Sequence, residues 1–204
     1  MARILILFAH PLLEKSRVHS ELIKAAQTVN GVTVNDLYEN YPEFDIDIEK
    51  EKKLLTSHDI IIWQHPFYWY SAPPILKQWQ DLVLEHGWAY GKKGWALQGK
   101  KVFNVFTTGA GAETYQPGAF NKYSIHEYLR PFERTAELCR MQYWPPYWIH
   151  GVHRMQPPAI QQHCTQYQNM LTAFVNDAIS EKELNSHSLM NHLFPILQQT
   201  NNGT

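Results

Sequence analysis

Continuous apolar runs recur along the chain, separated by segments in which apolar residues return every three or four positions. Residues 4–8 and 60–63 are apolar throughout, as are strands inside a parallel sheet that is covered on both faces. Residues 32–37 alternate between apolar and polar side chains as a strand does, and residues 101–106 predict a further strand. Four strands are therefore expected within residues 4–106.

A fifth strand is expected within residues 141–152, with a break at Pro145-Pro146. Helical spacing predicts helices between the strands and after the last one, over residues 18–29, 48–55, 74–85, 131–140 and 158–179. Strands that alternate with helices form parallel sheets with right-handed crossovers. The sequence therefore predicts an α/β fold with a five-stranded parallel sheet and helices on both faces.

Residues 1–180 contain no linker or internal repeat, and we interpret them as one domain. Residues 181–204 form a C-terminal tail of different character, with a polar end that is expected to be disordered. One more amphipathic helix is predicted in this tail from the apolar residues Leu189, Met190, Leu193, Phe194 and Leu197. Docking on the domain, contact with a partner and disorder remain open for the tail.

The charge balance narrows the classes of function. The 204 residues carry a formal net charge of -1, so the chain has no bulk attraction to nucleic acid or to an anionic membrane. The first apolar run is too short for a signal peptide or a transmembrane helix, which predicts a cytoplasmic protein.

Cys139 and Cys164 belong to no metal or redox motif and are expected to be buried or partly buried thiols. His65, His86 and His150 lack a ligand spacing, and no metal site is expected.

The loop after the first strand carries His10, Lys15, Ser16 and Arg17 ahead of a helix that starts near Val18. The free N–H groups of a helix N-terminus, together with a hydroxyl, suit a phosphate. The alternative is that Ser16 only caps the helix. Neither G-x-G-x-x-G nor a P-loop is present, which disfavours a Rossmann dinucleotide fold and a nucleotide triphosphatase.

Two further loops leave strand ends at the same expected edge of the sheet. The loop after the third strand contains four consecutive aromatic residues, 67–70, which suggest either a flat ligand or a plug over the sheet edge. Residues 107–111 offer hydroxyls, backbone N–H groups and small residues that allow a ring system to approach. Ligands of open α/β sheets bind at the carboxyl ends of strands. A phosphate turn, an aromatic wall and a small-residue shelf at that edge predict a site for flavin mononucleotide.

Several motifs together resemble those of a known family. In chain order they are Ala9-His10-Pro11, Leu37-Tyr38, Tyr41-Pro42, Phe44-Asp45-Ile46-Asp47-Ile48, Trp63-Gln64-His65-Pro66, Trp69-Tyr70-Ser71, Pro74-Ile75-Leu76-Lys77, His86-Gly87-Trp88-Ala89-Tyr90-Gly91, Leu97-Gln98-Gly99-Lys100 and Thr107-Thr108-Gly109. The chain resembles the flavodoxin-like NAD(P)H:quinone oxidoreductases, and it is most similar to the ancillary subunits of glutathione-regulated potassium-efflux systems. The resemblance covers roughly residues 3–175.

The resemblance implies a flavodoxin-like fold, a homodimer and a bound FMN, with FAD left open. For the flavin phosphate it implies His10, Ser16, Arg17, Val18 and His19. For the isoalloxazine it implies Phe67, Tyr68, Trp69 and Tyr70 on one side and Thr107, Thr108, Gly109 and Ala110 on the other. Tyr115 is expected near the flavin, either as a proton donor or charge stabiliser or as a lid aromatic that packs on substrate. Backbone N–H groups near Thr108 and Gly109 are expected to stabilise the reduced flavin.

The chain departs from the family pattern at three positions. The wider quinone reductases carry a histidine six residues beyond the tyrosine, where this chain has Asn121. The potassium-efflux relatives often have an asparagine in place of His19 and a second glycine in place of Ala110. Some ancillary subunits of that group have little or no oxidoreductase activity, so a weakened activity is one reading of this chain.

The resemblance implies a two-electron ping-pong reductase, in which NAD(P)H passes a hydride to the flavin and a quinone or similar small acceptor then takes its place. The alternative is a regulatory flavin-binding subunit that activates a potassium-efflux antiporter from the inner face of the membrane. The aromatic loop and residues 88–91 would then contact the dimer mate or the partner. In either reading, residues 144–148 are expected to form a substrate-side wall or a dimer seam. A one-electron carrier is disfavoured because such carriers tend to be strongly acidic.

Overall fold

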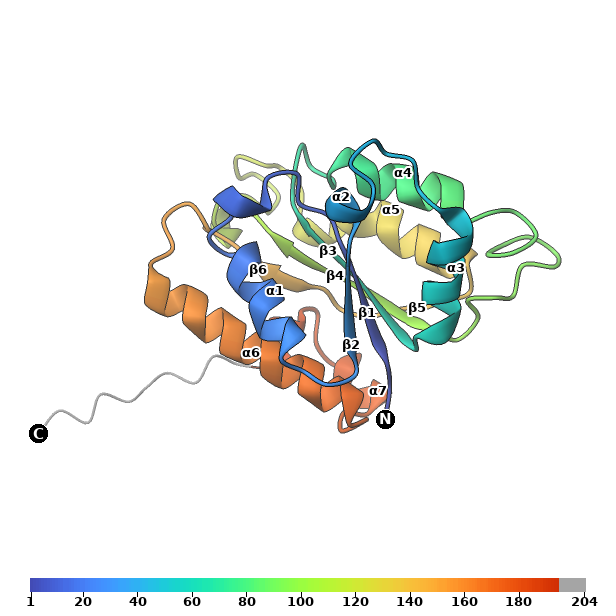
Figure 1. Cartoon of the computed structure of the whole chain (residues 1–204). Coiled ribbons are helices and arrows are strands. Elements are labelled where there is room, and N and C mark those ends of the chain that lie inside the picture. Colours follow the sequence, from blue (N-terminus) through green and yellow to red (C-terminus); the bar gives the residue numbers. More distant parts are fainter. Residues whose placement is uncertain (195–204) are drawn as a thin grey trace, which may run out of the picture.

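A parallel sheet forms the centre of the molecule (Figure 1), and the computed structural model describes residues 1–194. The strands are β1 (Ile4–Phe8), β2 (Val32–Asp36), β3 (Ile60–Pro66), β4 (Lys101–Thr107), β5 (Gln142–Tyr143) and β6 (Tyr147–Ile149). Their order across the sheet is β2-β1-β3-β4-β5, with β6 also paired to β4. Every pair is parallel, which confirms the predicted α/β fold.

The fifth position of the sheet is shared by two short strands. β5 pairs with Lys101 and Val102 at the start of β4, and β6 pairs with residues 105–107 at its end. Pro145 and Pro146 lie between them and have no N–H groups for a ladder. The predicted fifth strand is therefore present, and it is interrupted where the two prolines predicted a break.

The strand order places a topological switch point beside β1. The chain passes from β1 to β2 on one side, and β3 then pairs with the other side of β1. Because these strands are parallel, the loops that follow β1, β3 and β4 leave the same edge of the sheet. A crevice opens at the carboxyl ends of strands where the winding direction reverses, and ligands of such folds bind there.

Helices cover both faces of the sheet (Figure 1). α1 (His19–Gln27) and α6 (Pro157–Val175) pack against each other on one face. The other face is covered by α2 (Leu37–Asn40), α3 (Ile48–Ser57), α4 (Pro74–Val83) and α5 (Ile125–Leu138). Short 3-10 turns at Leu13–Lys15 and Ala112–Thr114 lie within the loops after β1 and β4. The loops of interest thus leave a sheet that is covered on both faces.

The two faces bury separate apolar cores. Ile4, Ile6 and Phe8 of β1 belong to the core beneath α1 and α6, whereas Leu5 and Leu7 belong to the opposite core. Side chains of a strand alternate between the faces, and all five of these residues are fully buried. This double burial is the reason that β1 is apolar throughout.

Both cysteines are buried, in opposite cores. Cys139 follows α5 and Cys164 lies on α6. Burial raises the pKa of each thiol to about 11. Both are free thiols that stay protonated at neutral pH, as expected for side chains with a packing role.

The fifth helix begins earlier than the sequence predicted. α5 starts at Ile125, and Pro131 lies inside it instead of at its first turn. A capping box precedes it, because the Glu127 N–H donates to Ser124 Oγ over 3.3 Å and the Ser124 N–H donates to Glu127 Oε2 over 2.7 Å. This cap starts the helix upstream and outweighs the missing N–H of the proline.

A buried carboxylate joins α3, β2 and α4, and two of its donors, Tyr41 and Trp79, belong to an apolar core. Glu51 of α3 is fully buried and accepts from Asn35 Nδ2 of β2 at 2.9 and 2.8 Å. The Tyr41 hydroxyl donates to it over 2.7 Å and Trp79 Nε1 of α4 over 2.8 Å. Four donor contacts thus satisfy one carboxylate and fix α3 against β2 and α4.

The C-terminal tail forms two short turns, α7 (Glu181–Leu184) and α8 (Met190–Leu193), where the sequence predicted one helix. Leu184 and Met190 are buried against the α1–α6 face. Leu197, the last apolar residue of the predicted helix, and the polar end that follows lie outside the described residues. Among residues 1–194, no helix combines the length and the apolar character that crossing a membrane requires.

Candidate functional site

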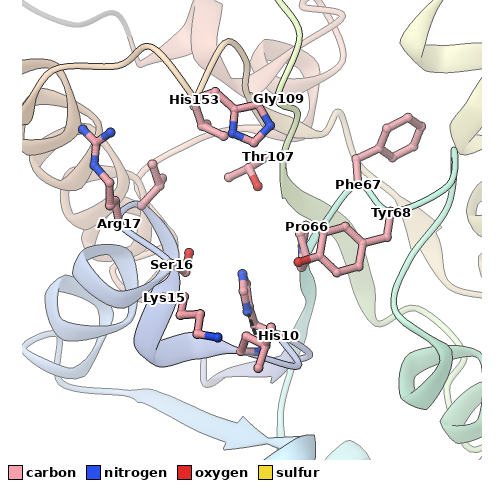
Figure 2. Close-up of a pocket in the computed structure, with 13 residues that line it drawn as sticks. His10, Lys15, Ser16, Arg17, Pro66, Phe67, Tyr68, Thr107, Gly109 and His153 are labelled. Atoms are coloured by element: carbon pink, nitrogen blue, oxygen red, sulfur yellow. Dashed lines mark hydrogen bonds between the residues drawn. The ribbon is translucent and has the colours of Figure 1, made fainter.

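A cavity of about 370 Å³ opens at the carboxyl edge of the sheet. Figure 2 shows its lining, which comes from the loops after β1, β3, β4 and β6. The lining residues are His10, Leu12, Lys15, Ser16, Arg17, Val18, Pro66, Phe67, Tyr68, Thr107, Gly109, Val152 and His153. Loops far apart in the sequence therefore meet at the switch point, as their strand ends predicted.

The N-terminus of α1 forms one end of the cavity. Ser16 Oγ accepts from the His19 N–H over 3.1 Å, so the serine does cap the helix and keeps its own O–H as a donor. The N–H groups of Arg17 and Val18 make no hydrogen bond to any described residue. Three donors at a positive helix end are thus available to an anion.

Basic side chains surround this end of the cavity. Lys15, Arg17, His10 and His153 all line it. In Figure 2 the Lys15 ammonium points toward His10, and the Arg17 guanidinium lies at the margin, where it donates to the carbonyl of Met155. The positive charges of Lys15 and Arg17 favour a phosphate or carboxylate here, although the whole chain is close to neutral.

His10 presents an N–H to the cavity. Its Nδ1 accepts from the Leu12 N–H over 3.2 Å, which places the proton of the neutral ring on Nε2. Figure 2 shows the ring directed into the cavity. Burial lowers the pKa of His10 and the carboxylate of Glu14 opposes that shift, so the ring is a neutral donor at neutral pH.

A buried relay ends at the Thr107 hydroxyl. Tyr167 donates to Gln64 Oε1 over 2.8 Å, and Gln64 Nε2 lies 3.4 Å from His19 Nδ1. His19 Nε2 then lies 3.1 Å from Thr107 Oγ1. With Gln64 as donor to His19, the His19 proton sits on Nε2 and is donated to Thr107. The Thr107 hydroxyl is left to donate into the cavity.

Burial places His19 behind the cavity lining. The ring is almost fully buried, and burial lowers its pKa well below the usual range, with the charges of His10 and His65 adding to the shift. His19 was predicted to bind the flavin phosphate itself, but it does not line the cavity. Its Nε2 lies next to Thr107 Oγ1 instead, and direct contact with the phosphate stays a prediction.

The aromatic loop contributes unequally to the cavity. Tyr68 turns its hydroxyl toward the cavity, whereas the Phe67 ring points away in Figure 2 and packs on Tyr115 and Tyr128. Trp69 is 93% exposed, and it and Tyr70 adopt φ values of +49° and +63°. A left-handed backbone at two bulky residues stores strain, which is common where a ligand or partner binds.

The loop after β4 places one free N–H at the cavity. The Thr108 N–H was predicted to face the ligand, but it donates to the Ile149 carbonyl over 2.9 Å and is therefore not available. The Gly109 N–H makes no hydrogen bond to any described residue. A Cβ on Gly109 would fall 2.3 Å from His153 Nε2, so a side chain there would crowd the wall. Ala110 lies next to this wall and does not line the cavity.

Tyr115 stands beside the cavity in an aromatic cluster. Its ring meets Phe67 at 6.0 Å and Trp148 at 5.5 Å, both edge to face. Burial raises the pKa of Tyr115, and the nearby Tyr70 adds to the shift, so the phenol keeps its proton. Asn121, at the position of the family histidine, does not line the cavity. Its Nδ2 donates to Thr114 Oγ1 over 2.9 Å and so stabilises the loop after β4.

His65 supports the aromatic loop from below. Asn104 Nδ2 lies 3.0 Å from His65 Nε2, and His65 Nδ1 lies 3.0 Å from the Pro66 carbonyl. The ring is fully buried between Phe106 and Phe132, and burial lowers its pKa to about 4. The neutral ring thus holds Pro66, the last residue of β3, immediately before the aromatic loop. This is a hydrogen-bonding role, as predicted.

This burial predicts an acid-sensitive fold. The unfolded chain protonates His65 near pH 6.5 and the folded protein only near pH 4. The unfolded state therefore binds more protons in that window, and stability falls as the pH falls. We expect His65 alone to cost about 3 kcal/mol of unfolding free energy between pH 7 and pH 4. Urea titrations at several pH values measure this loss.

The matched variants are His65→Asn and His86→Asn. His86 is exposed, so its replacement is the surface control for removing a histidine. His65→Asn is expected to flatten the dependence between pH 4 and 6.5, since the titrating group is gone. An equally steep dependence in His65→Asn would contradict this account.

The structure brings together most of the residues that the sequence selected. Those that line the cavity are His10, Ser16, Arg17, Val18, Phe67, Tyr68, Thr107 and Gly109. Those that lie behind or beside it are His19, Trp69, Tyr70, Thr108, Ala110 and Tyr115. Lys15, which the sequence placed in the candidate phosphate loop, also lines the cavity. The lining residues that sequence reasoning missed are Leu12, Pro66, Val152 and His153. His153 follows the fifth strand position, and the rule that ligands bind at carboxyl ends of strands could have found it.

Comparison with known proteins agrees with this geometry. A family model described as a flavodoxin-like fold matches residues 2–171. A curated relative named "Glutathione-regulated potassium-efflux system ancillary protein KefG", from Enterobacter sp., is 42% identical over 172 residues, which cover 84% of this chain and 94% of the relative.

Two solved structures resemble the chain closely. General stress protein 14 from Treponema denticola, in complex with FMN, has a TM-score of 0.77 and 39% identity, covering 86% of this chain and 98% of that one. An NADPH-quinone reductase from P. pentosaceus has a TM-score of 0.76 and 36% identity, covering 83% of this chain and 98% of that one.

Proposed function

The chain belongs to the family with the flavodoxin-like fold, and from this premise we propose that it is an FMN-dependent NAD(P)H:quinone oxidoreductase. The observation that carries the proposal is a cavity at the switch point, with a donor-rich helix end on one side and the aromatic loop on the other. The similar structures named for FMN binding and for quinone reduction add support. FAD remains the alternative form of the cofactor.

The residues present fit FMN. A cavity of about 370 Å³ is within the range of small-molecule sites, which is about 300–1,000 Å³. Ser16 and the N–H groups of Arg17 and Val18 suit the phosphate, and Lys15 adds positive charge. At the other end, Tyr68 and the small residue Gly109 leave room for a flat ring. Each end of the cavity thus matches one end of the cofactor.

The flavin, when bound, supplies the chemistry of accepting a hydride from NAD(P)H and passing two electrons to a quinone. The chain's own residues bind and orient. Ser16 and the start of α1 hold the phosphate, and the hydroxyl of Thr107 and the Nε2–H of His10 donate into the middle of the cavity. The Gly109 N–H offers a fixed dipole to negative charge at the ring. Tyr68, which lines the cavity, forms the wall on the side of the aromatic loop.

Tyr115 is assigned a role beside the ring. Its phenol keeps its proton because burial raises its pKa, so its O–H is able to donate to a negatively charged oxygen of the quinone product. The packing of Tyr115 on Phe67 and Trp148 also makes it a wall for a flat substrate. The second role needs only the ring, and Tyr115→Phe separates the two.

Steady-state kinetics test the proposed activity. With FMN present, we expect NADPH or NADH to reduce a soluble quinone with parallel lines in double-reciprocal plots, because both substrates use one place in turn. Hydroquinone and oxidised nicotinamide should form in equal amounts, since one hydride and one solvent proton complete each turnover. Intersecting lines would contradict the shared place. Absence of turnover with bound FMN would favour the second function below.

The second candidate is a regulatory flavin-binding subunit of a potassium-efflux antiporter. It is favoured by the curated relative whose name assigns it to such a system as an ancillary protein. In this role the chain would sit at the inner face of the membrane through its partner. The exposed aromatic residues Trp69 and Phe120, 93% and 86% exposed, would contact either the antiporter or a second copy of the chain in a homodimer.

A further inference from the structure

Residues 181–194 lie beyond residue 171, where the match to the family model ends. Hydrogen bonds join them to the outer edge of the sheet and to α6. The Met190 N–H donates to the Pro146 carbonyl over 2.9 Å, and Gln166 Nε2 of α6 donates to the Asn191 carbonyl over 3.3 Å. This C-terminal extension therefore packs next to β6, the strand that precedes His153.

The Asn191 carboxamide pairs with β6 as a neighbouring strand would. Its Oδ1 accepts from the Trp148 N–H over 2.9 Å, and its Nδ2 donates to the Trp148 carbonyl over 3.0 Å. The backbone N–H and C=O groups of Trp148 point away from β4, because those of Tyr147 and Ile149 face β4. One side chain thus satisfies both outward backbone groups at the centre of β6.

Trp148 in turn holds the loop after β4. Its Nε1 donates to Thr108 Oγ1 over 2.9 Å. Its ring is almost fully buried, and it stacks on Phe106 at 6.2 Å with an interplanar angle of 6°. The Thr108 N–H donates to the Ile149 carbonyl, next in sequence to Trp148. Thr107 and Gly109, on either side of Thr108, line the cavity.

We propose that Asn191 is a positioning residue for the candidate site, which acts through Trp148 on Thr108. By pairing with the backbone of Trp148, Asn191 fixes the position of the indole relative to β4. The indole in turn fixes the Thr108 hydroxyl. The extension thereby sets the wall formed by Thr107 and Gly109. This role rests on the proposed function only for the identity of the ligand, since the hydrogen bonds that join Asn191, Trp148 and Thr108 form without a ligand.

The contacts favour this role over simple protection of an edge. An exposed strand edge is commonly blunted by a charge, a proline or a covering loop. β6 has only three residues and follows Pro146, so its edge is already short and blocked. The two-way pairing by Asn191 adds orientation to a tryptophan that reaches from this edge to the cavity wall.

Three variants test the inference. Asn191→Ala removes both contacts. Asn191→Asp keeps the acceptor but sets a carboxylate oxygen against the Trp148 carbonyl. Asn185→Ala is the matched control, an exposed asparagine in the same extension. Amide hydrogen exchange of Thr108 in flavin-free protein and the dissociation constant for FMN are measured for each, together with the thermal midpoint.

We expect both Asn191 variants to speed exchange at Thr108 and to weaken FMN binding by about three- to ten-fold, as the loss of a hydrogen-bonded contact would. Asn191→Asp should show the larger effect, and Asn185→Ala should show neither. Unchanged exchange at Thr108 would overturn the proposal. So would faster exchange with unchanged FMN affinity, because the extension would then only cover an edge.

The same experiments separate a failure of the proposed function from a failure of the positioning role. If the unaltered protein does not bind FMN, the assignment of the ligand is wrong, and the exchange rate of Thr108 alone still decides whether Asn191 positions it. If FMN binds and the Asn191 variants behave as the control, the ligand assignment stands and the positioning role is rejected.

Discussion

Replacing Glu51 with alanine is expected to lower the free energy of unfolding by about 3–5 kcal/mol. The carboxylate is fully buried and accepts from Asn35, Tyr41 and Trp79. Alanine would leave these donors without an acceptor in an interior that water does not reach, and it would leave a cavity as well. Urea unfolding at neutral pH measures the loss.

Glu49→Ala is the control for this prediction. Glu49 lies on the same helix, its side chain is 74% exposed, and it pairs with Lys52. Exposed ion pairs contribute about 0–1 kcal/mol, so the control should stay within that range. Glu51→Gln should fall between the two, because an amide keeps one acceptor and sets its NH₂ against a donor. A loss from Glu51→Ala no larger than the control would show that the network contributes little.

Ser16→Asp is expected to weaken FMN binding by at least about a hundred-fold without destabilising the fold. Aspartate is a good N-cap and its charge suits a helix N-terminus, so the first turn of α1 should hold or tighten. The same charge would stand beside the phosphate, where two like charges about 4 Å apart repel by about 4 kcal/mol at a dielectric constant near 20. Fluorescence titration with FMN measures the change.

Two controls isolate the phosphate. Ser16→Asn has the same shape and caps equally well, so it should retain most of the FMN affinity. Riboflavin lacks the phosphate, and its affinity should be nearly equal in Ser16→Asp and the unaltered protein. An equal loss of FMN and riboflavin binding in Ser16→Asp would mean that the start of α1 does not hold the phosphate.

Much of this arrangement could be predicted from the chain because the determinants are local. The residues of β1 are apolar on both sides, and this pattern predicts a central parallel strand whatever the rest of the fold. Once the strands are known to be parallel, their carboxyl ends must share an edge, and the loops at His10, Tyr68 and Gly109 must meet. The positions of the loops follow from topology alone.

The remaining features depend on long-range packing. His19 begins α1, and only the depth of that turn against Thr107 shows that the ring lies behind the cavity. Thr108 loses its N–H to Ile149, a partner 41 positions away in the printed sequence. Asn191 reads as an ordinary polar residue in a tail, and its role appears only where it meets Trp148. No pattern within a window of a few residues contains these pairings.

The visible spectrum of the protein, first supplied with FMN and then with anaerobic NADPH or NADH, is the decisive test of the proposed reductase. We expect a yellow protein that bleaches within seconds and regains its colour when a quinone is added. A protein that stays yellow under both nicotinamides would contradict the reductase and favour the regulatory subunit. A protein that remains colourless and takes up no FMN would contradict the site itself.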